Sequence, residues 1–543
     1  MSNLRTFLPR AQDYAQSRRN WRADLLAGVT VGIVALPLAL AFGVSSGVGA
    51  EAGLITAVVA GFIAAVFGGS NVQVSGPTGA MVVVLAPVVA VYGPSAVVVV
   101  GLIAGFIVVA MGLLKLGRAV SFIPWPVIEG FTLGIAVIIF LQQVPAAVGS
   151  PDIKESTSAL VNGYLSVVAA NPAAVAWSAG SVILVAAIMV LLPKFVKLIP
   201  GSIIAIVVVT VLAEVLAAPL ARIGVLPSSL KAPSWPDFSS INLGAMIAPA
   251  IAVAALAAIE SLLSARVAST MGDNGTFDPD RELFGQGLAS IGSALFGGMP
   301  ATGAIARTAV NIRSGGKTRM AAIVHAAVLL GVVYLATGPV SRIPLAALSG
   351  VLMVTAARMI PWRAMFSIIK STKSDAVIFV ATAIITVGFD LIEAVIIGIV
   401  ATAFFALRAL VKSSGVHRES IPGEAQPGDE RIAVFRMQGA LFFGASDRIL
   451  DSVTHVSGVS VVIIRMSELQ FLDATGARVL VDIVDQLERQ GITALIKGVQ
   501  PGHIDLVRRV GVLGKLRHEN HLFDNLDAAV AHARSHIVRE ASA

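Results

Sequence analysis

The chain has 543 residues, of which 56% are hydrophobic and 13% are charged. Soluble proteins carry about 25% charged residues, so the composition excludes a soluble protein for most of the length. Cysteine is absent, which excludes disulfides and thiolate metal sites. Seven of the eight histidines lie beyond residue 416, so an imidazole metal site is not expected in the apolar part. We expect no metal and no other cofactor for the chain as a whole. The net charge of +7 is explained by basic cytosolic loops, without a nucleic-acid partner.

Charge-free runs long enough to span a bilayer as helices recur from residue 24 to residue 412. The arginine-rich residues 1–23 that precede them are interpreted as a cytosolic arm. Fourteen segments are predicted in chain order, at 24–43, 52–68, 77–91, 95–114, 126–144, 174–192, 199–218, 243–264, 283–298, 302–312, 320–338, 343–360, 375–389 and 391–410. The third and the tenth are too short to cross a membrane alone.

The basic residues indicate the topology. With the N-terminus inside, every loop after an even-numbered segment should be basic. Lys115 and Arg118 follow the fourth segment, and Lys194 and Lys197 follow the sixth. The loops after the eighth, tenth and twelfth segments are basic as well. We therefore expect a multi-pass protein of the plasma membrane with both termini in the cytoplasm.

The composition changes at about residue 413. Residues 413–430 are polar and contain Pro and Gly, which is typical of a linker. Short apolar strands then alternate with helical patterns through residues 431–543. This alternation predicts a small cytosolic α/β domain.

Two interrupted apolar segments resemble each other. One, "AAVFGGSNVQVSGPTGAM", begins at Ala64, and the other, "SALFGGMPATGAIAR", begins at Ser293. Each has an apolar helix ending in Phe-Gly-Gly, an irregular stretch with Pro, and then Thr-Gly-Ala. Because the predicted topology brings the copies in from opposite sides, they indicate an inverted repeat of seven spans per half, with halves at about 24–218 and 243–412. Interrupted segments at matching places in two halves point to the binding site of a transporter.

The two Thr-Gly-Ala triplets, Thr78-Gly79-Ala80 and Thr302-Gly303-Ala304, are predicted to start short helices near the bilayer midplane. A helix start exposes N–H groups without intrahelical partners and carries roughly half a positive charge. Two facing starts therefore suit an anion. The alternative is that Gly and Ala only allow close helix packing; the inverted duplication favours a ligand site.

Two charged residues fall within predicted spans. Glu260 is the only charged residue between Asp237 and Arg266, and a charge within a span is costly and a functional candidate. If Glu260 takes up a proton, it admits an anion that its carboxylate would otherwise repel, so we predict that it couples transport to protons. Arg307 would place a fixed positive charge beside the second helix start. The alternatives are an ion pair between Glu260 and Arg307, or an Arg307 side chain that snorkels to the interface.

Together these motifs resemble the SulP family of sulfate permeases and related anion transporters, over nearly the whole chain. The similar stretches are "GVTVGIVALPLALAFGV", "QVSGPTGAM", "IESLLSA", "RELFGQGLASIGSALFGG" and "TGAIARTAVNIRSGGKTR", and the C-terminal part resembles the STAS domain. The resemblance implies two inverted seven-span repeats arranged as core and gate bundles, and a homodimer. It implies an anion site formed by Phe42, Thr78, Gly79, Ala80, Glu260, Thr302, Gly303, Ala304 and Arg307.

The resemblance implies a secondary anion transporter that lies in the lipid bilayer. We do not expect an enzyme, because the membrane part of the sequence contains no nucleophile–base arrangement. Members carry sulfate, bicarbonate, halides or dicarboxylates. Glu rather than Asp at position 260 is similar to bacterial members that move dicarboxylates such as fumarate or succinate with protons, which is the function we expect. The alternatives are a sulfate or bicarbonate transporter or an anion exchanger without proton coupling, and a membrane receptor that signals through its STAS domain.

The STAS domain carries one candidate phosphorylation site. The stretch "LDATGAR" resembles the strand-to-helix turn that is phosphorylated in anti-sigma-factor antagonists, with Thr475 at the modified position and Ala474 departing from the pattern. A helix N-cap formed by Asp473 or Thr475 explains the stretch without phosphorylation and is the interpretation we favour. A regulatory partner of the STAS domain is also expected from the resemblance.

Overall fold

The computed structural model describes residues 6–118, 124–150, 159–195, 201–224, 229–230, 232–236, 242–271, 277–388, 391–442, 453 and 457–542. The chain forms two compact units, Met1–Ile399 and Val400–Ala543. The division falls within one helix, α18.

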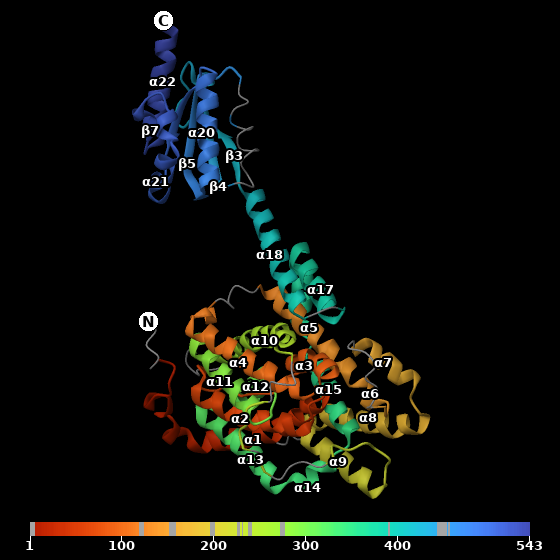
Figure 1. The fold of residues 1–543 in the computed structure, drawn as a ribbon. Coiled ribbons are helices and arrows are strands. Elements are labelled where there is room, and N and C mark those ends of the chain that lie inside the picture. The colour runs from red at the N-terminus through yellow and green to blue at the C-terminus, as the bar shows by residue number, and fades with distance from the viewer. Residues whose placement is uncertain are drawn as a thin grey trace. The chain divides into compact units, whose positions relative to one another are not determined.

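Each of the fourteen predicted segments corresponds to one helix of the structure (Figure 1). These helices are α1 (Ser17–Ser45), α2 (Ala50–Phe67), α3 (Gly79–Tyr92), α4 (Ser95–Leu113), α5 (Trp125–Gln142), α8 (Pro172–Phe195), α9 (Gly201–Val215), α10 (Leu243–Thr270), α11 (Pro279–Leu295), α12 (Ile305–Arg313), α13 (Arg319–Leu335), α15 (Leu345–Met359), α17 (Lys373–Gly388) and α18 (Leu391–Ser413). Seven helical segments among the described residues are long and apolar enough to cross a membrane. The shorter helices α6 (Val144–Ala147), α7 (Ala159–Val168), α14 (Thr337–Ser341) and α16 (Trp362–Ser371) were not predicted.

The two interrupted segments meet each other in space. Helix α3 has 14 residues and α12 has 9, so both are too short to span a bilayer. Each follows a two-residue strand, β1 (Ser75–Gly76) or β2 (Thr302–Gly303). The strands pair antiparallel, with Ser75 opposite Gly303 and Gly76 opposite Thr302. The pairing joins the starts of two half-helices that are more than 200 residues apart in the sequence.

This pairing corrects the alignment of the two copies. The sequence pattern aligns the two Thr-Gly-Ala triplets, but Thr78 is the residue immediately before α3 whereas Thr302 lies in β2. The antiparallel pair has an approximate two-fold axis at its centre. This axis makes Ser75 equivalent to Thr302 and Gly76 equivalent to Gly303. The identical letters misled the alignment because the loops after the two Gly-Gly pairs differ in length.

A buried carboxylate shapes the first break. Helix α2 ends at Phe67, and Glu282 of α11 accepts hydrogen bonds from the backbone N–H groups of Gly69 (2.8 Å) and Ser70 (3.2 Å). A Cβ atom on Gly69 would lie 1.9 Å from the carbonyl oxygen of Asp278, so this close approach of α2 to α11 requires glycine. The bend then directs the chain into β1.

The second unit is a five-stranded sheet with helices on both faces. Its strand order is β3 (Gly415–Glu419), β4 (Ile432–Leu441), β5 (Val461–Leu472), β6 (Thr493–Lys497) and β7 (Leu522–Phe523), and all neighbours except β3 and β4 run parallel. Helices α20 (Ala474–Arg489) and α21 (Pro501–Val510) pack on one face and α22 (Leu526–Ser542) on the other (Figure 1). Alternate residues of the central strands point to the two faces.

One predicted boundary needs correction in this unit. Residues 413–430 were interpreted as a linker, but β3 lies within them and pairs with β4. The sequence "GVHRE" lacks the apolar alternation of the central strands because β3 is an edge strand, where polar side chains are favoured. Composition alone therefore did not identify it as a strand.

Candidate functional site

Two helix starts with free N–H groups lie at the centre of the candidate site. Thr78 precedes α3 and Ala304 precedes α12, and neither start has a side-chain cap. Among the described residues, the backbone N–H groups of 79–81 and of 305–307 donate no hydrogen bond. Such N–H groups, together with the helix dipole, suit a negatively charged ligand.

Glu260 of α10 lies between the two segments. The hydroxyl groups of Thr78 and Thr302 each donate a hydrogen bond of 2.8 Å to the Oε2 atom of Glu260. The two hydroxyl oxygens lie 3.2 Å apart. One carboxylate thus connects a residue from each interrupted segment.

The hydrogen-bond partners of Glu260 are neutral hydroxyl groups, which affects how readily its carboxylate can take up a proton. A hydroxyl group can donate to a carboxylate and can also accept from a protonated carboxyl group. Glu260 can therefore change protonation state with only a rotation of the threonine hydroxyls. An ion pair would have favoured the charged form, but no ion pair joins Glu260 to Arg307 among the described residues.

Arg307 is buried, with 2% of its surface exposed. Its Nη2 atom donates a hydrogen bond of 2.6 Å to the carbonyl oxygen of Pro77, while Nη1 has no hydrogen-bond partner. This geometry excludes the alternative in which Arg307 snorkels to the interface. A cationic side chain of the second segment instead reaches the backbone that leads into α3.

The backbone before α12 is held by neighbouring groups. Gly303 donates its N–H to the hydroxyl oxygen of Ser261 at 3.0 Å, and Ala304 donates to the carbonyl oxygen of Val74 at 3.0 Å. The N–H groups of these two residues are therefore engaged, and the free ones begin at Ile305. The second half-helix, predicted to start at the triplet Thr302-Gly303-Ala304, therefore starts just after it, at Ile305.

Apolar groups enclose the start of α3. Phe42 of α1 is buried, with 6% of its surface exposed. A Cβ atom on Gly79 would lie 2.1 Å from Ile139 Cδ1 and 3.5 Å from Phe42 Cε1. Ala80 and Ala304 are buried as well. The nine residues that the resemblance implied thus lie on the two interrupted segments or on helices α1 and α10 beside them. Their role in anion binding stays a prediction.

Two polar residues that the sequence analysis missed lie in the same region. Gln73 is buried and both polar atoms of its side chain lack a hydrogen-bond partner. A Cβ atom on Gly303 would lie 1.5 Å from Gln73 Nε2, so the amide lies directly against β2. Ser261 is the other. Gln73 lies within the quoted stretch "QVSGPTGAM", and Ser261 follows Glu260, so proximity to the motifs was the available signal.

His325 of α13 is fully buried, as a packed helix residue should be. Neither of its ring nitrogens has a hydrogen-bond partner. The ring lies next to α2, where a Cβ atom on Gly61 would approach it to 3.6 Å.

In the second unit, Asp473 forms the N-cap of α20. Its Oδ1 atom accepts a hydrogen bond of 2.7 Å from the N–H of Gly476, which confirms the capping interpretation. Thr475 is exposed in the first turn of the same helix. Its phosphorylation stays a prediction.

Comparison with known proteins gives the family. The chain matches the model of the Sulfate permease family over residues 21–382 and that of the STAS domain over residues 425–529. A putative sulfate transporter of Bacillus subtilis, YvdB, is 34% identical over 525 residues, which cover 94% of this chain and 97% of that protein. The bicarbonate transporter BicA of Picosynechococcus is 31% identical over 496 residues, covering 86% and 87%.

Solved structures are similar as well. The transmembrane domain of a cyanobacterium bicarbonate transporter, BicA, matches with a TM-score of 0.63 at 30% identity, over 71% of this chain and 98% of that one. The overall structure of SLC26A9 matches with a TM-score of 0.83 at 16% identity, over 99% and 94%, which shows a shared fold. With the family model covering more than half of its length and relatives above 30% identity along most of it, the chain belongs to the sulfate permease family and ends in a STAS domain.

Proposed function

We propose that this membrane protein is a proton-coupled secondary transporter that carries a dicarboxylate, such as fumarate or succinate, by alternating access. Anion transport is the activity that its family and its relatives have in common. The proton coupling and the dicarboxylate are the finer parts of the proposal. We place the protein in the plasma membrane with both termini in the cytoplasm, in keeping with the basic loops.

The observation that carries the proposal is the position of Glu260. Its carboxylate accepts hydrogen bonds from Thr78 and Thr302, which belong to the two segments whose helix starts are free. A carboxylate at this place repels an anion bound at the helix starts, and a protonated carboxyl group does not. Binding of a proton at Glu260 and binding of an anion beside it therefore favour each other.

The charge of the site supports a divalent anion. Two free helix starts each carry roughly half a positive charge, and Arg307 adds a full charge with one Nη atom unpartnered. A dicarboxylate can place one carboxylate group at each of two such positions. Sulfate has the same charge in a smaller volume and is the first alternative, because a relative is named a putative sulfate transporter.

Bicarbonate is a second candidate, favoured by a specific observation. The BicA relatives, 30% and 31% identical to this chain, are named bicarbonate transporters. An exchanger without proton coupling and a receptor that signals through the STAS domain remain as outcomes of the test below. We also propose that the protein is a homodimer and that its STAS domain binds a regulatory partner.

The test is uptake of labelled anions into proteoliposomes that contain the purified full chain. Fumarate, succinate, sulfate and bicarbonate are each offered with an inward proton gradient, with an inward sodium gradient, and with neither. We expect the dicarboxylates to accumulate above their equilibrium concentration only with the proton gradient. Liposomes without protein provide the background.

Other outcomes of the uptake experiment would overturn the substrate, the proton coupling or the transport activity itself. Accumulation of sulfate or bicarbonate alone would overturn the dicarboxylate. Uptake that depends only on an anion trapped inside the vesicle would identify an exchanger and overturn proton coupling. No uptake of any anion by folded protein would favour the receptor.

A further inference from the structure

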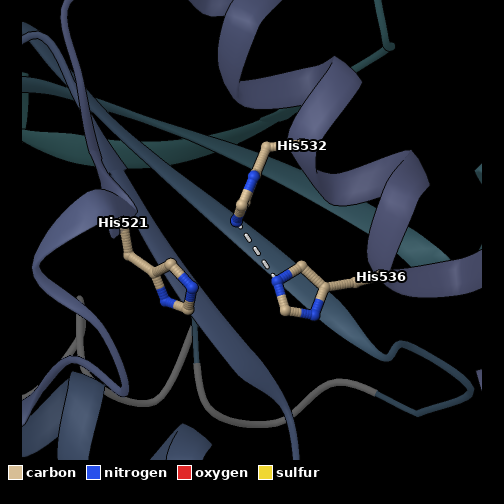
Figure 2. A group of neighbouring side chains, drawn as sticks. All are labelled: His521, His532 and His536. Carbon is tan, nitrogen blue, oxygen red and sulfur yellow. Dashed lines mark hydrogen bonds between the residues drawn. The ribbon is translucent and has the colours of Figure 1, made fainter. Parts of the chain in front are cut away.

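Three histidines form a cluster in the STAS domain. His521 ends a 3-10 turn, η6 (Glu519–His521), just before β7, and His532 and His536 lie on α22 (Figure 2). One possible ligand atom from each side chain lies within 4.8 Å of the others. The ring centroids are 5.4 Å apart for His521 and His532, 5.5 Å for His521 and His536, and 4.9 Å for His532 and His536. Two separate segments of the fold thus bring three imidazoles together.

Two of these histidines are held in a fixed arrangement by the helix. His532 and His536 are four residues apart, so they project from the same side of α22. Another side of the helix packs against the sheet through Ala529, Ala533 and Ile537. The packing fixes α22 next to the segment that carries His521.

The spacing of the nitrogens matches a metal site. The Nε2 atoms of His532 and His536 lie 3.3 Å apart. In a tetrahedral zinc site with Zn–N bonds of about 2.0–2.1 Å, two ligand nitrogens lie about 3.3 Å apart. The third nitrogen lies within 4.8 Å of both, so a small side-chain rotation completes three corners of a tetrahedron.

One imidazole of the cluster has a ring nitrogen without a partner. His521 is buried, with 3% of its surface exposed, and its Nδ1 atom has no hydrogen-bond partner. Buried polar atoms are nearly always paired, so this arrangement calls for a ligand.

We propose that His521, His532 and His536 bind a zinc ion, with a fourth position open to water. Three histidines with one open position are a known zinc geometry, and an all-imidazole set also suits copper and nickel. The chain contains no cysteine, so no thiolate competes for the ion. Arg517 carries a positive charge near the cluster, but it forms an ion pair with Glu488. Bound zinc would fasten the segment before β7 to the last helix of the STAS domain.

The test uses the full chain, purified in detergent, freed of any polyhistidine tag and treated with a chelator. Cobalt(II) is titrated as a spectroscopic probe, and zinc is then added to displace it. We expect one cobalt ion per chain with the intense visible absorption of a tetrahedral site. We also expect zinc to raise the unfolding temperature, because it binds only the folded state.

Substitutions of the three histidines test whether they are the residues that bind the metal ion. The double variant His532→Gln, His536→Gln should lose the cobalt absorption and the thermal shift by zinc, while the single variant His521→Asn should weaken binding by at least about tenfold, since even second-shell changes cost 10–100-fold. The control is His417→Gln, an exposed histidine of β3 outside the cluster, which should behave as the wild type.

Two results would overturn the proposal. An octahedral cobalt spectrum, or no stoichiometric binding, in the wild type would show that the three rings form no metal site. Undiminished binding in a folded double variant, checked by circular dichroism, would place the ion elsewhere on the chain. The wild-type spectrum decides the first point even if a variant fails to fold.

Discussion

The carboxylate of Glu260 accepts hydrogen bonds from one threonine of each interrupted segment, and both partners are neutral. Replacing Glu260 by Gln keeps the shape and an oxygen that accepts these bonds, but removes the proton-binding group. We expect Glu260→Gln to bind the anion and to exchange it across the membrane. We expect it not to concentrate the anion when only a proton gradient is imposed.

The pH dependence of binding follows from the same residue. If the loaded carrier holds one proton more than the empty one, affinity rises as the pH falls, by up to about tenfold per pH unit. Glu260→Gln should remove this dependence, as measured by substrate-induced thermal shift at several pH values. The matched control is Glu129→Gln in α5, where an amide oxygen can still accept the hydrogen bond from Trp125. A pH slope that persists in Glu260→Gln would assign the coupling proton to another group.

Gly303 allows β2 to approach Gln73. A Cβ atom at this position would overlap with the amide of Gln73, so Leu must displace that side chain and place bulk before α12. We expect Gly303→Leu to be expressed at the wild-type level and to lose transport. Gly331→Leu in α13, where no atom lies within 4 Å of an added Cβ, is the control. Wild-type uptake by Gly303→Leu would move the binding site elsewhere.

Motifs pointed to most residues of the candidate site one by one, but they did not indicate the hydrogen bonds among these residues. The duplicated Thr-Gly-Ala letters marked the correct stretches, yet Thr78 and Thr302 occupy different local positions. Gln73 and Ser261 were missed because a single polar residue next to a motif has no periodicity or spacing of its own. Burial of Arg307 could not be read from the sequence either, since a snorkelling arginine has the same local pattern.

At the scale of elements, Glu282 connects α11 to the end of α2. Removal of its carboxylate leaves the N–H groups of Gly69 and Ser70 without this acceptor. The cost is about 1–3 kcal/mol for the buried Ser70 and less for the partly buried Gly69. We expect Glu282→Ala to lower the unfolding temperature of the protein in detergent and to weaken anion binding, because β1 follows this bend. Glu282→Gln keeps an acceptor oxygen, so its unfolding temperature should lie between that of Glu282→Ala and that of the wild type. An unchanged unfolding temperature in Glu282→Ala would show that the bend is held by other contacts.

Helix-forming segments were predictable because hydropathy follows burial in the bilayer, and all fourteen were found. Among the described residues of the unit Met1–Ile399, the α-helices that were missed are α6, α7, α14 and α16, which have between four and ten residues. Such elements are fixed by their neighbours rather than by their own sequence. Strands β1 and β2, of two residues each, exist only because the two segments meet, and no local pattern encodes that meeting.

At the scale of the whole molecule, all nine candidate anion-site residues lie in the unit Met1–Ile399. We expect a chain truncated after Ser413, which keeps α18 complete, to fold and to bind the anion. The relative BicA has been solved as its transmembrane domain, which supports independent folding. The measurement is a substrate-dependent thermal shift of the truncated protein. A folded truncation without such a shift would show that the STAS domain is needed for binding.

Among the described residues, the hydrogen bond from Arg307 of the second half to Pro77 of the first half has no counterpart from the first half to the second. The corresponding positions of the first half-helix are the apolar Ala80 and Met81, so no reverse bond exists between them. A carrier made of two identical halves would have inward-open and outward-open forms of equal free energy, by symmetry alone. The two halves of this chain differ, and the Arg307–Pro77 hydrogen bond is one of the differences at the candidate site. Equal populations of the two forms are therefore not expected of the empty carrier proposed here. Its uptake and efflux rates then differ when the same gradient is reversed, although the final distribution of the anion depends only on the driving gradients.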